Sequence, residues 1–200
     1  MKIKSAGEVR GMDRCETPRE KTCCFTGHRS SKLPWGTNES DPRCIRLKAS
    51  LADAVEAVYA EGVRHFICGM AEGCDTFFGE AVAELRRSHP DVTLEAAVPC
   101  EEQDLRWSPE RTERYDRLLA ECDKRTLVSR HYTPDCMMRR NRYMVDRSCV
   151  VIAVFNGSAG GTVNTLRYAI ASGLKIIEID PQVFDIQPHM MYNVRPCVRM

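Results

Sequence analysis

Three short segments combine glycine with charged or polar side chains in a pattern suited to binding an anion. They are Gly27-His28-Arg29, the run from Gly69 to Asp75, and Gly160-Gly161-Thr162. Glycine lets the backbone N–H groups approach a ligand closely. A guanidinium can hold a phosphate through two parallel hydrogen bonds, and an imidazole can donate a further one. Together the three segments predict a binding site for phosphate or carboxylate.

The third segment has the clearest local context. The run from Val150 to Phe155 is apolar without alternation, which is typical of a strand buried on both faces of a parallel sheet. From Thr162 the apolar period becomes helical, and Gly173 is placed to end the helix. N–H groups at a helix start lie at the positive end of the helix dipole, which favours an anion. An ordinary tight strand-to-helix turn is the alternative interpretation of the same residues.

Several polar residues also have two interpretations. Asp75 could accept a hydrogen bond from a ribose hydroxyl, or it could cap the helix that it begins. His28 either contacts the ligand or is a solvated loop histidine. Helical spacing places Asn141 in a stripe with Met138 and Val145, so its amide needs a buried partner, either backbone or ligand.

The elements that must position these residues alternate along the whole chain. Strands are predicted at 21–26, 65–68, 94–98, 125–129, 150–155 and 175–179, with amphipathic helices between them. This alternation predicts an α/β fold with a single doubly wound, mostly parallel Rossmann-like sheet and helices on both faces. Ligands bind such sheets beyond the carboxyl ends of the strands, where the strand order reverses. Residues 21–181 are expected to form one domain, with a loose leader at 1–20 and a tail at 182–200.

The composition restricts the class of protein. The chain has 200 residues, with 29 basic against 28 acidic side chains and a net charge of +1, which argues against a general surface for nucleic acid or membrane. A local basic patch is compatible with this balance. There is no apolar run of membrane-spanning length and no signal-peptide core. The eleven cysteines form no C-x-x-C pair, so we expect reduced thiols in the cytoplasm and neither a disulfide framework nor a zinc site.

Five segments in this order resemble the YpsA/YoqJ-like branch of the SLOG superfamily: FTGHR, GMAEGCD, Pro99-Cys100, RRNRYMVDRS and VFNGSAGGTVNT. The resemblance covers about residues 21–181. It implies a Rossmann-like fold that binds nucleotides or nucleotide-derived ligands. By this resemblance the ligand-binding positions are Gly27, His28, Arg29, Gly69, Gly73, Asp75, Arg140, Asn141, Asp146, Gly160, Gly161 and Thr162.

One departure from the resemblance bears on catalysis. LOG-type phosphoribohydrolases of this superfamily carry a glutamate where this chain has Thr165. Cleavage of an N-glycosidic bond passes through an oxocarbenium-like state that a carboxylate stabilises, and a hydroxyl cannot supply that charge. Glu72 and Asp75 are the carboxylates that could substitute, and Glu72 joins the candidate site for this reason.

The resemblance therefore implies a sensor or regulatory protein that binds a nucleotide or an ADP-ribose-like compound, with no certain cofactor. The alternative is a nucleotide N-glycosidase or phosphoribohydrolase of the LOG type. Binding of single-stranded DNA, as in the DprA relatives, needs a positive groove and stacking aromatics, and the balanced charge argues against it. A homo-oligomer or a protein partner stays open.

Overall fold

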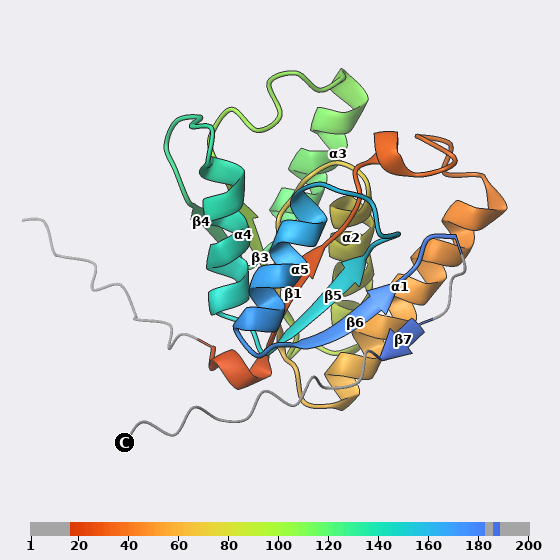
Figure 1. Cartoon of the computed structure of the whole chain (residues 1–200), viewed down its shortest axis with the longest axis vertical. Coiled ribbons are helices and arrows are strands. Elements are labelled where there is room, and N and C mark those ends of the chain that lie inside the picture. The colour runs from red at the N-terminus through yellow and green to blue at the C-terminus, as the bar shows by residue number, and fades with distance from the viewer. Residues whose placement is uncertain (1–16, 183–185, 189–200) are drawn as a thin grey trace, which may run out of the picture.

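A computed structural model describes residues 17–182 and 186–188, and within them one sheet forms the centre of the molecule (Figure 1). The strand order is β4-β3-β2-β1-β5-β6-β7. The strands are β1 (Thr22–Thr26), β2 (His65–Cys68), β3 (Thr93–Val98), β4 (Lys124–Leu127), β5 (Val150–Val154), β6 (Lys175–Ile179) and β7 (Ile186–Pro188). β1 to β6 are parallel, and β7 pairs antiparallel with β6. The predicted mostly parallel sheet is confirmed.

Five helices cover the two faces of the sheet (Figure 1). They are α1 (Pro42–Ala60), α2 (Cys74–Ser88), α3 (Pro109–Ala120), α4 (Cys136–Asp146) and α5 (Gly161–Ala171). α1, α2 and α3 pack on one face, where Phe25, Phe66 and Phe78 are fully buried. α4 and α5 pack on the other, over a smaller cluster that includes Ile67 and Val145. This distribution of helices confirms a doubly wound, Rossmann-like fold.

The reversal of strand order lies between β1 and β5. From β1 the chain adds β2, β3 and β4 on one side, and it then crosses back through α4 to place β5 on the other side of β1. Right-handed crossovers put the helices of the two halves on opposite faces. The segments that follow β1 and β5 therefore separate, and they leave room for a ligand at the carboxyl ends of these two strands.

The chain departs from the sequence-based boundaries in three places. The sheet continues to β7, beyond the predicted domain end at 181. β4 begins at Lys124 and is an exposed edge strand. Its sequence therefore lacks the apolar pattern that marks the start of a buried strand. Within the predicted leader, Arg19 donates from Nε to the Ser148 carbonyl at 2.8 Å and from Nη2 to the Ser172 carbonyl at 3.1 Å. These bonds attach the described end of the leader to the domain.

Two further properties concern the residues that the structure describes. None of their helices combines the length and apolar character needed to cross a membrane. Their nine cysteines are free thiols, and burial raises the pKa of Cys24 to about 12. Such a thiol stays protonated and packs as a small apolar group.

Candidate functional site

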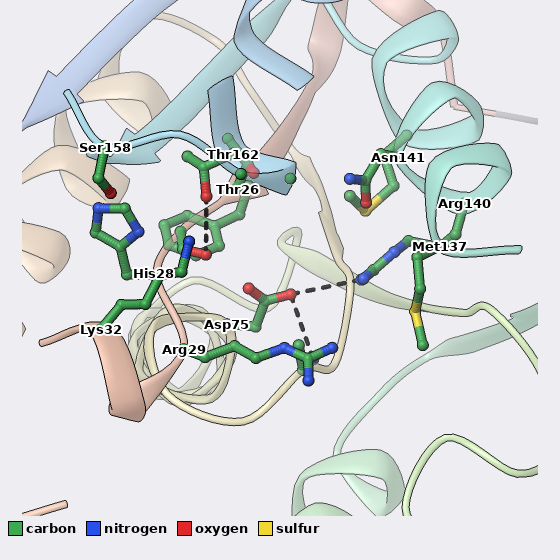
Figure 2. Close-up of a pocket in the computed structure, with 16 residues that line it drawn as sticks. Thr26, His28, Arg29, Lys32, Asp75, Met137, Arg140, Asn141, Ser158 and Thr162 are labelled. Carbon is green, nitrogen blue, oxygen red and sulfur yellow. Dashed lines mark hydrogen bonds and ion pairs between the residues drawn. The ribbon is translucent and has the colours of Figure 1, made fainter. Parts of the chain in front are cut away.

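A cleft of about 170 Å³ lies where the strand order reverses, and Figure 2 shows the side chains that line it. Nine of the thirteen residues predicted from the sequence lie in its lining: Gly27, His28, Arg29, Asp75, Arg140, Asn141, Gly160, Gly161 and Thr162. The structure adds Phe25, Thr26, Lys32, Ala71, Met137, Met144 and Ser158. Gly69, Glu72, Gly73 and Asp146 lie outside the lining.

The N-terminal turn of α5 opens directly into this cleft. Gly160, the residue before the helix, has φ +152° and ψ −164°, a conformation that side chains oppose. At Gly161 an added Cβ would meet no atom within 4 Å, so the space beside this turn is open. Thr162 Oγ1 donates to the Gly27 carbonyl at 3.2 Å, which ties α5 to the loop after β1. The turn therefore has the geometry of a helix N-terminal anion site.

His28 and Lys32 hold the loop that precedes α5. His28 is 2% exposed, and its Nε2 lies 2.8 Å from Asn156 Oδ1, which also accepts from the Ser158 N–H at 3.2 Å. Lys32 Nζ donates to the Ala159 carbonyl at 2.9 Å. The interpretation of His28 as a solvated loop residue is wrong, because packing between two loops buries it. Burial lowers the pKa of His28 although the bond to Asn156 opposes this effect, so the imidazole is neutral near pH 7.

Asp75 and Arg140 form a buried pair on the opposite side of the cleft. Each is 6% exposed, and Arg140 Nη1 lies 3.5 Å from Asp75 Oδ2 (Figure 2). Arg140 Nε is buried and has no hydrogen-bond partner among the described residues. Burial raises the pKa of the Asp75 carboxyl, and the positive charge of Arg140 offsets part of that rise. The pair is long and incompletely bonded, so it retains hydrogen-bonding capacity for a ligand.

The helix-capping interpretation of Asp75 is wrong. Its Oδ2 accepts from the Ala71 N–H at 3.3 Å, which lies in the loop before α2, and Gly73 occupies the cap position without a side-chain bond. The carboxyl therefore shapes the loop and faces the cleft.

Asn141 has the buried partner that its position requires, but the partner is a side chain. Its Nδ2 donates to Thr165 Oγ1 at 2.8 Å, and the same hydroxyl donates to the Gly161 carbonyl at 3.0 Å. Thr165 is 3% exposed and is not in the cleft lining. The predicted stripe with Met138 is wrong, because Met138 is 48% exposed. The buried face of α4 runs through Cys136, Arg140, Met144 and Val145 instead, and this rotation turns Met138 outward.

The predicted glycines in the first two segments serve loop packing. A Cβ at Gly27 would lie 2.6 Å from Cys74 Cβ, and one at Gly69 would lie 1.5 Å from Arg140 Nη1. Gly73 has φ +90°, and a Cβ there would lie 2.6 Å from the Ser30 nitrogen. These positions bring the loops after β1 and β2 together, and Gly69 leaves the space that the guanidinium occupies.

Two of the predicted acidic residues are engaged elsewhere. Glu72 Oε2 forms an ion pair with Arg111 Nη1 at 2.6 Å. Asp146 Oδ1 accepts from the Tyr168 hydroxyl at 2.8 Å on the surface. Both carboxylates therefore bond within the protein, outside the cleft lining.

Sequence reasoning missed Lys32, Met137 and Met144. Lys32 stands three residues after Arg29 in the loop that follows β1, and this second basic residue was the available signal. Met137 and Met144 flank Asn141 at intervals of four and three residues, which places them on its side of the helix. Their contribution is an apolar wall on the α4 side of the cleft.

The strand order and the glycine turn at the reversal point define a Rossmann-like α/β protein with a cleft suited to an anionic ligand. Residues 23–177 match the model of the YspA SLOG family (YpsA), and the chain belongs to that family. The resemblance inferred from the motifs is confirmed.

Two bacterial relatives illustrate the similarity. The chain is 32% identical over 142 residues to the uncharacterized SPbeta prophage-derived protein YoqJ of Bacillus subtilis (strain 168), a match that covers 64% of this chain and 83% of YoqJ. It is 23% identical over 144 residues to a UPF0398 protein of Bacillus pumilus (strain SAFR-032), covering 71% of this chain and 77% of that protein.

Solved structures of DNA processing protein A (DprA) share the fold. The Streptococcus pneumoniae protein aligns with a TM-score of 0.56 and 15% identity over 83% of this chain, which spans about half (52%) of that protein. The Helicobacter pylori protein, whose structure concerns single-stranded DNA binding, aligns with a TM-score of 0.54 and 13% identity over 84% of this chain and 68% of its own. At these identities the likeness is one of fold alone.

Proposed function

We propose that the protein binds a nucleotide or a nucleotide-derived small molecule, such as an ADP-ribose-like compound, and acts as a sensor or regulatory protein. One observation carries the proposal: a single cleft joins the open N-terminal turn of α5 to the buried Asp75–Arg140 pair (Figure 2). The turn suits a phosphate group. The Asp75 carboxyl suits a ribose hydroxyl, since a carboxylate accepts hydrogen bonds.

The charge of the cleft supports the same ligand class. Arg29, Lys32 and Arg140 line it together with one carboxyl, that of Asp75. With His28 neutral, the cleft has an excess of positive charge that favours an anion such as a phosphate monoester or a diphosphate. The unpartnered Arg140 Nε is a further donor for an acceptor atom of the ligand.

The second candidate function is N-glycosidic cleavage, and the position of Asp75 favours it. Asp75 is the carboxyl among the lining residues, whereas Glu72 pairs with Arg111 and Thr165 is bonded to Asn141 outside the cleft. Arg140 Nη1 lies 3.5 Å from Asp75 Oδ2, however, and a guanidinium beside this carboxylate offsets the negative charge that would stabilise an oxocarbenium-like state. Binding without efficient cleavage is therefore the proposal we favour.

Single-stranded DNA binding has less support. Such binding uses aromatic side chains on which bases stack. The lining contains one phenylalanine and no tyrosine or tryptophan. That residue, Phe25, is fully buried and stacks on Phe78 with 4.7 Å between ring centroids, so it offers no platform to a base.

The test compares ligand binding by the native protein with that of Gly161→Val. Calorimetric titration and thermal shift would use AMP, ADP and ADP-ribose, with adenosine as the ligand that lacks phosphate. A valine fills the open space beside the turn and should weaken binding about 10- to 100-fold, as expected for one or two lost hydrogen bonds to a charged group.

Asn164→Val is the matched control, because it places the same β-branched residue at an exposed position of the same helix. It should retain native affinity. Tight binding by Gly161→Val would contradict the anion site, and the absence of any thermal shift with millimolar phosphorylated compounds would contradict the proposed function.

A further inference from the structure

The arginines of this protein are paired very differently on its two faces. On the side of α1, α2 and α3, guanidinium groups lie within ion-pair distance of carboxylates, as in Arg86–Glu121, Arg111–Glu72 and Arg114–Glu80. On α4, at its C-terminal cap and on α5, four exposed arginines form no ion pair with any residue of the described chain: Arg139, Arg142, Arg147 and Arg167. We call these four residues and the outer surfaces of α4 and α5 the arginine face.

The sequence of this region shows the same imbalance. Residues 136–173 contain five arginines and one aspartate, with no lysine and no glutamate. Without Arg140, which is buried beside Asp75, this segment carries a net charge of +3 within a chain of net charge +1. The single aspartate, Asp146, accepts a hydrogen bond from the Tyr168 hydroxyl. A nearly neutral protein therefore concentrates positive charge on one face, which attracts partners of opposite charge.

Two of these arginines lie over tyrosine rings. α4 and α5 pack side by side (Figure 1), and the guanidinium carbon of Arg147 lies 3.9 Å from the ring centroid of Tyr143. That of Arg142 lies 5.4 Å from the ring centroid of Tyr168. Such contacts restrict the side chains before a partner arrives, which lowers the entropy lost on binding. Exposed Met138 adds apolar area beside them, and arginine, tyrosine and methionine are residue types enriched at protein interfaces.

We propose that the arginine face is a docking surface for a protein partner that presents an acidic surface of aspartate and glutamate side chains. A guanidinium pairs with a carboxylate through two parallel hydrogen bonds, which gives both affinity and orientation. Nucleic acid matches this face less well, because both tyrosine rings lie under arginines rather than open to bases.

Neither terminal segment outside the described residues is acidic enough to match this face. Residues 1–16 contain four basic and three acidic side chains, and residues 189–200 contain two arginines and no acidic residue. A two-fold symmetric contact of the arginine face with its copy would place like charges against each other. The face and the cleft also use different residues, so failure of one proposal would leave the other intact.

The test measures binding of a fluorescent decaglutamate peptide by anisotropy at low ionic strength. Arg139→Glu/Arg167→Glu changes two exposed arginines that form no ion pair with the described residues, and it should raise the dissociation constant about tenfold. The control, Arg87→Glu/Arg117→Glu, makes the same change in net charge at two exposed arginines of α2 and α3. It should have a clearly smaller effect, with circular dichroism confirming that both variants fold.

Three results would overturn the proposal. The first is an equal loss of peptide binding in the two variants, which would mean that only net charge matters. The second is tighter binding of oligothymidylate, or of vesicles rich in phosphatidylserine, than of the peptide at the same salt concentration. The third is a concentration-dependent dimer of the native protein that the α4–α5 variant fails to form.

Discussion

Glu95 allows the electrostatics of the fold to be tested quantitatively. β3 carries this carboxylate into the layer beneath α4, where it is 1% exposed. It accepts from Thr126 Oγ1 at 2.6 Å and from the Tyr143 hydroxyl at 2.6 Å, and it lies 3.0 Å from His65 Nε2 and 3.2 Å from Lys124 Nζ. Burial alone would raise the pKa of Glu95, but these hydrogen bonds outweigh burial and lower it from 4.5 to about 2.

The direction of the pH effect on stability follows from the lowered pKa of Glu95 in the folded protein. Because the folded-state pKa lies below the unfolded value, folding favours the ionised carboxylate. Its stabilising contribution is complete above about pH 4.5 and is lost as the pH falls towards about 2. A difference of about 2.5 between the two pKa values corresponds to about 3 kcal/mol of unfolding free energy. By the same relation, about 1.4 kcal/mol of this is already lost at pH 3.5.

Urea unfolding of the native protein and of Glu95→Gln at pH 7 and pH 3.5 tests this reasoning. Glutamine keeps the size of the side chain and removes the charge. We expect the variant to be less stable by about 2–3 kcal/mol at pH 7, and the gap to narrow by about 1.4 kcal/mol at pH 3.5. Glu84→Gln, in an exposed pair with Arg87, is the control and should change stability by less than about 0.5 kcal/mol. A gap that is the same at both pH values would refute the reasoning.

Three further predictions concern the cleft. Gly69→Ala places a Cβ 1.5 Å from Arg140 Nη1 and should displace that guanidinium. Calorimetry should then show about tenfold weaker binding of a phosphorylated ligand. Unchanged affinity would exclude a role for Arg140 in binding. Asp75→Asn leaves a buried guanidinium without its carboxylate and should cost about 2–4 kcal/mol in urea unfolding, so a loss below about 0.5 kcal/mol would show that the pair is not coupled. The native protein should not release adenine from AMP at several turnovers per second. Thr165→Glu should lower the free energy of unfolding by about 1–3 kcal/mol, because the longer side chain crowds Asn141. This variant should not gain cleavage activity. Rapid release by the native protein would instead favour the N-glycosidase.

Much of the fold could be predicted because its signals are local. An unbroken apolar run such as 150–155 has to be buried on both faces, and glycine directly after such a run permits the turn into a helix. Leu47, Leu51, Val55 and Val58 are spaced as one face of a helix, and α1 buries all four. Edge elements carried weaker signals, since β4 is largely exposed and β7 has only three residues.

The sequence by itself determined the alternation of strands and helices, the glycine turns and the family motifs, because periodicity and turn chemistry are properties of neighbouring residues. Only the tertiary structure decided which polar groups meet. The rotation of α4, set by packing against the sheet, brought Arg140 to Asp75, 65 positions earlier in the chain, and Asn141 to Thr165. The tertiary structure also paired Glu72 with Arg111 and left the exposed arginines Arg139, Arg142, Arg147 and Arg167 without ion pairs to the described residues. These outcomes depend on distances between elements remote in sequence, which local patterns do not encode.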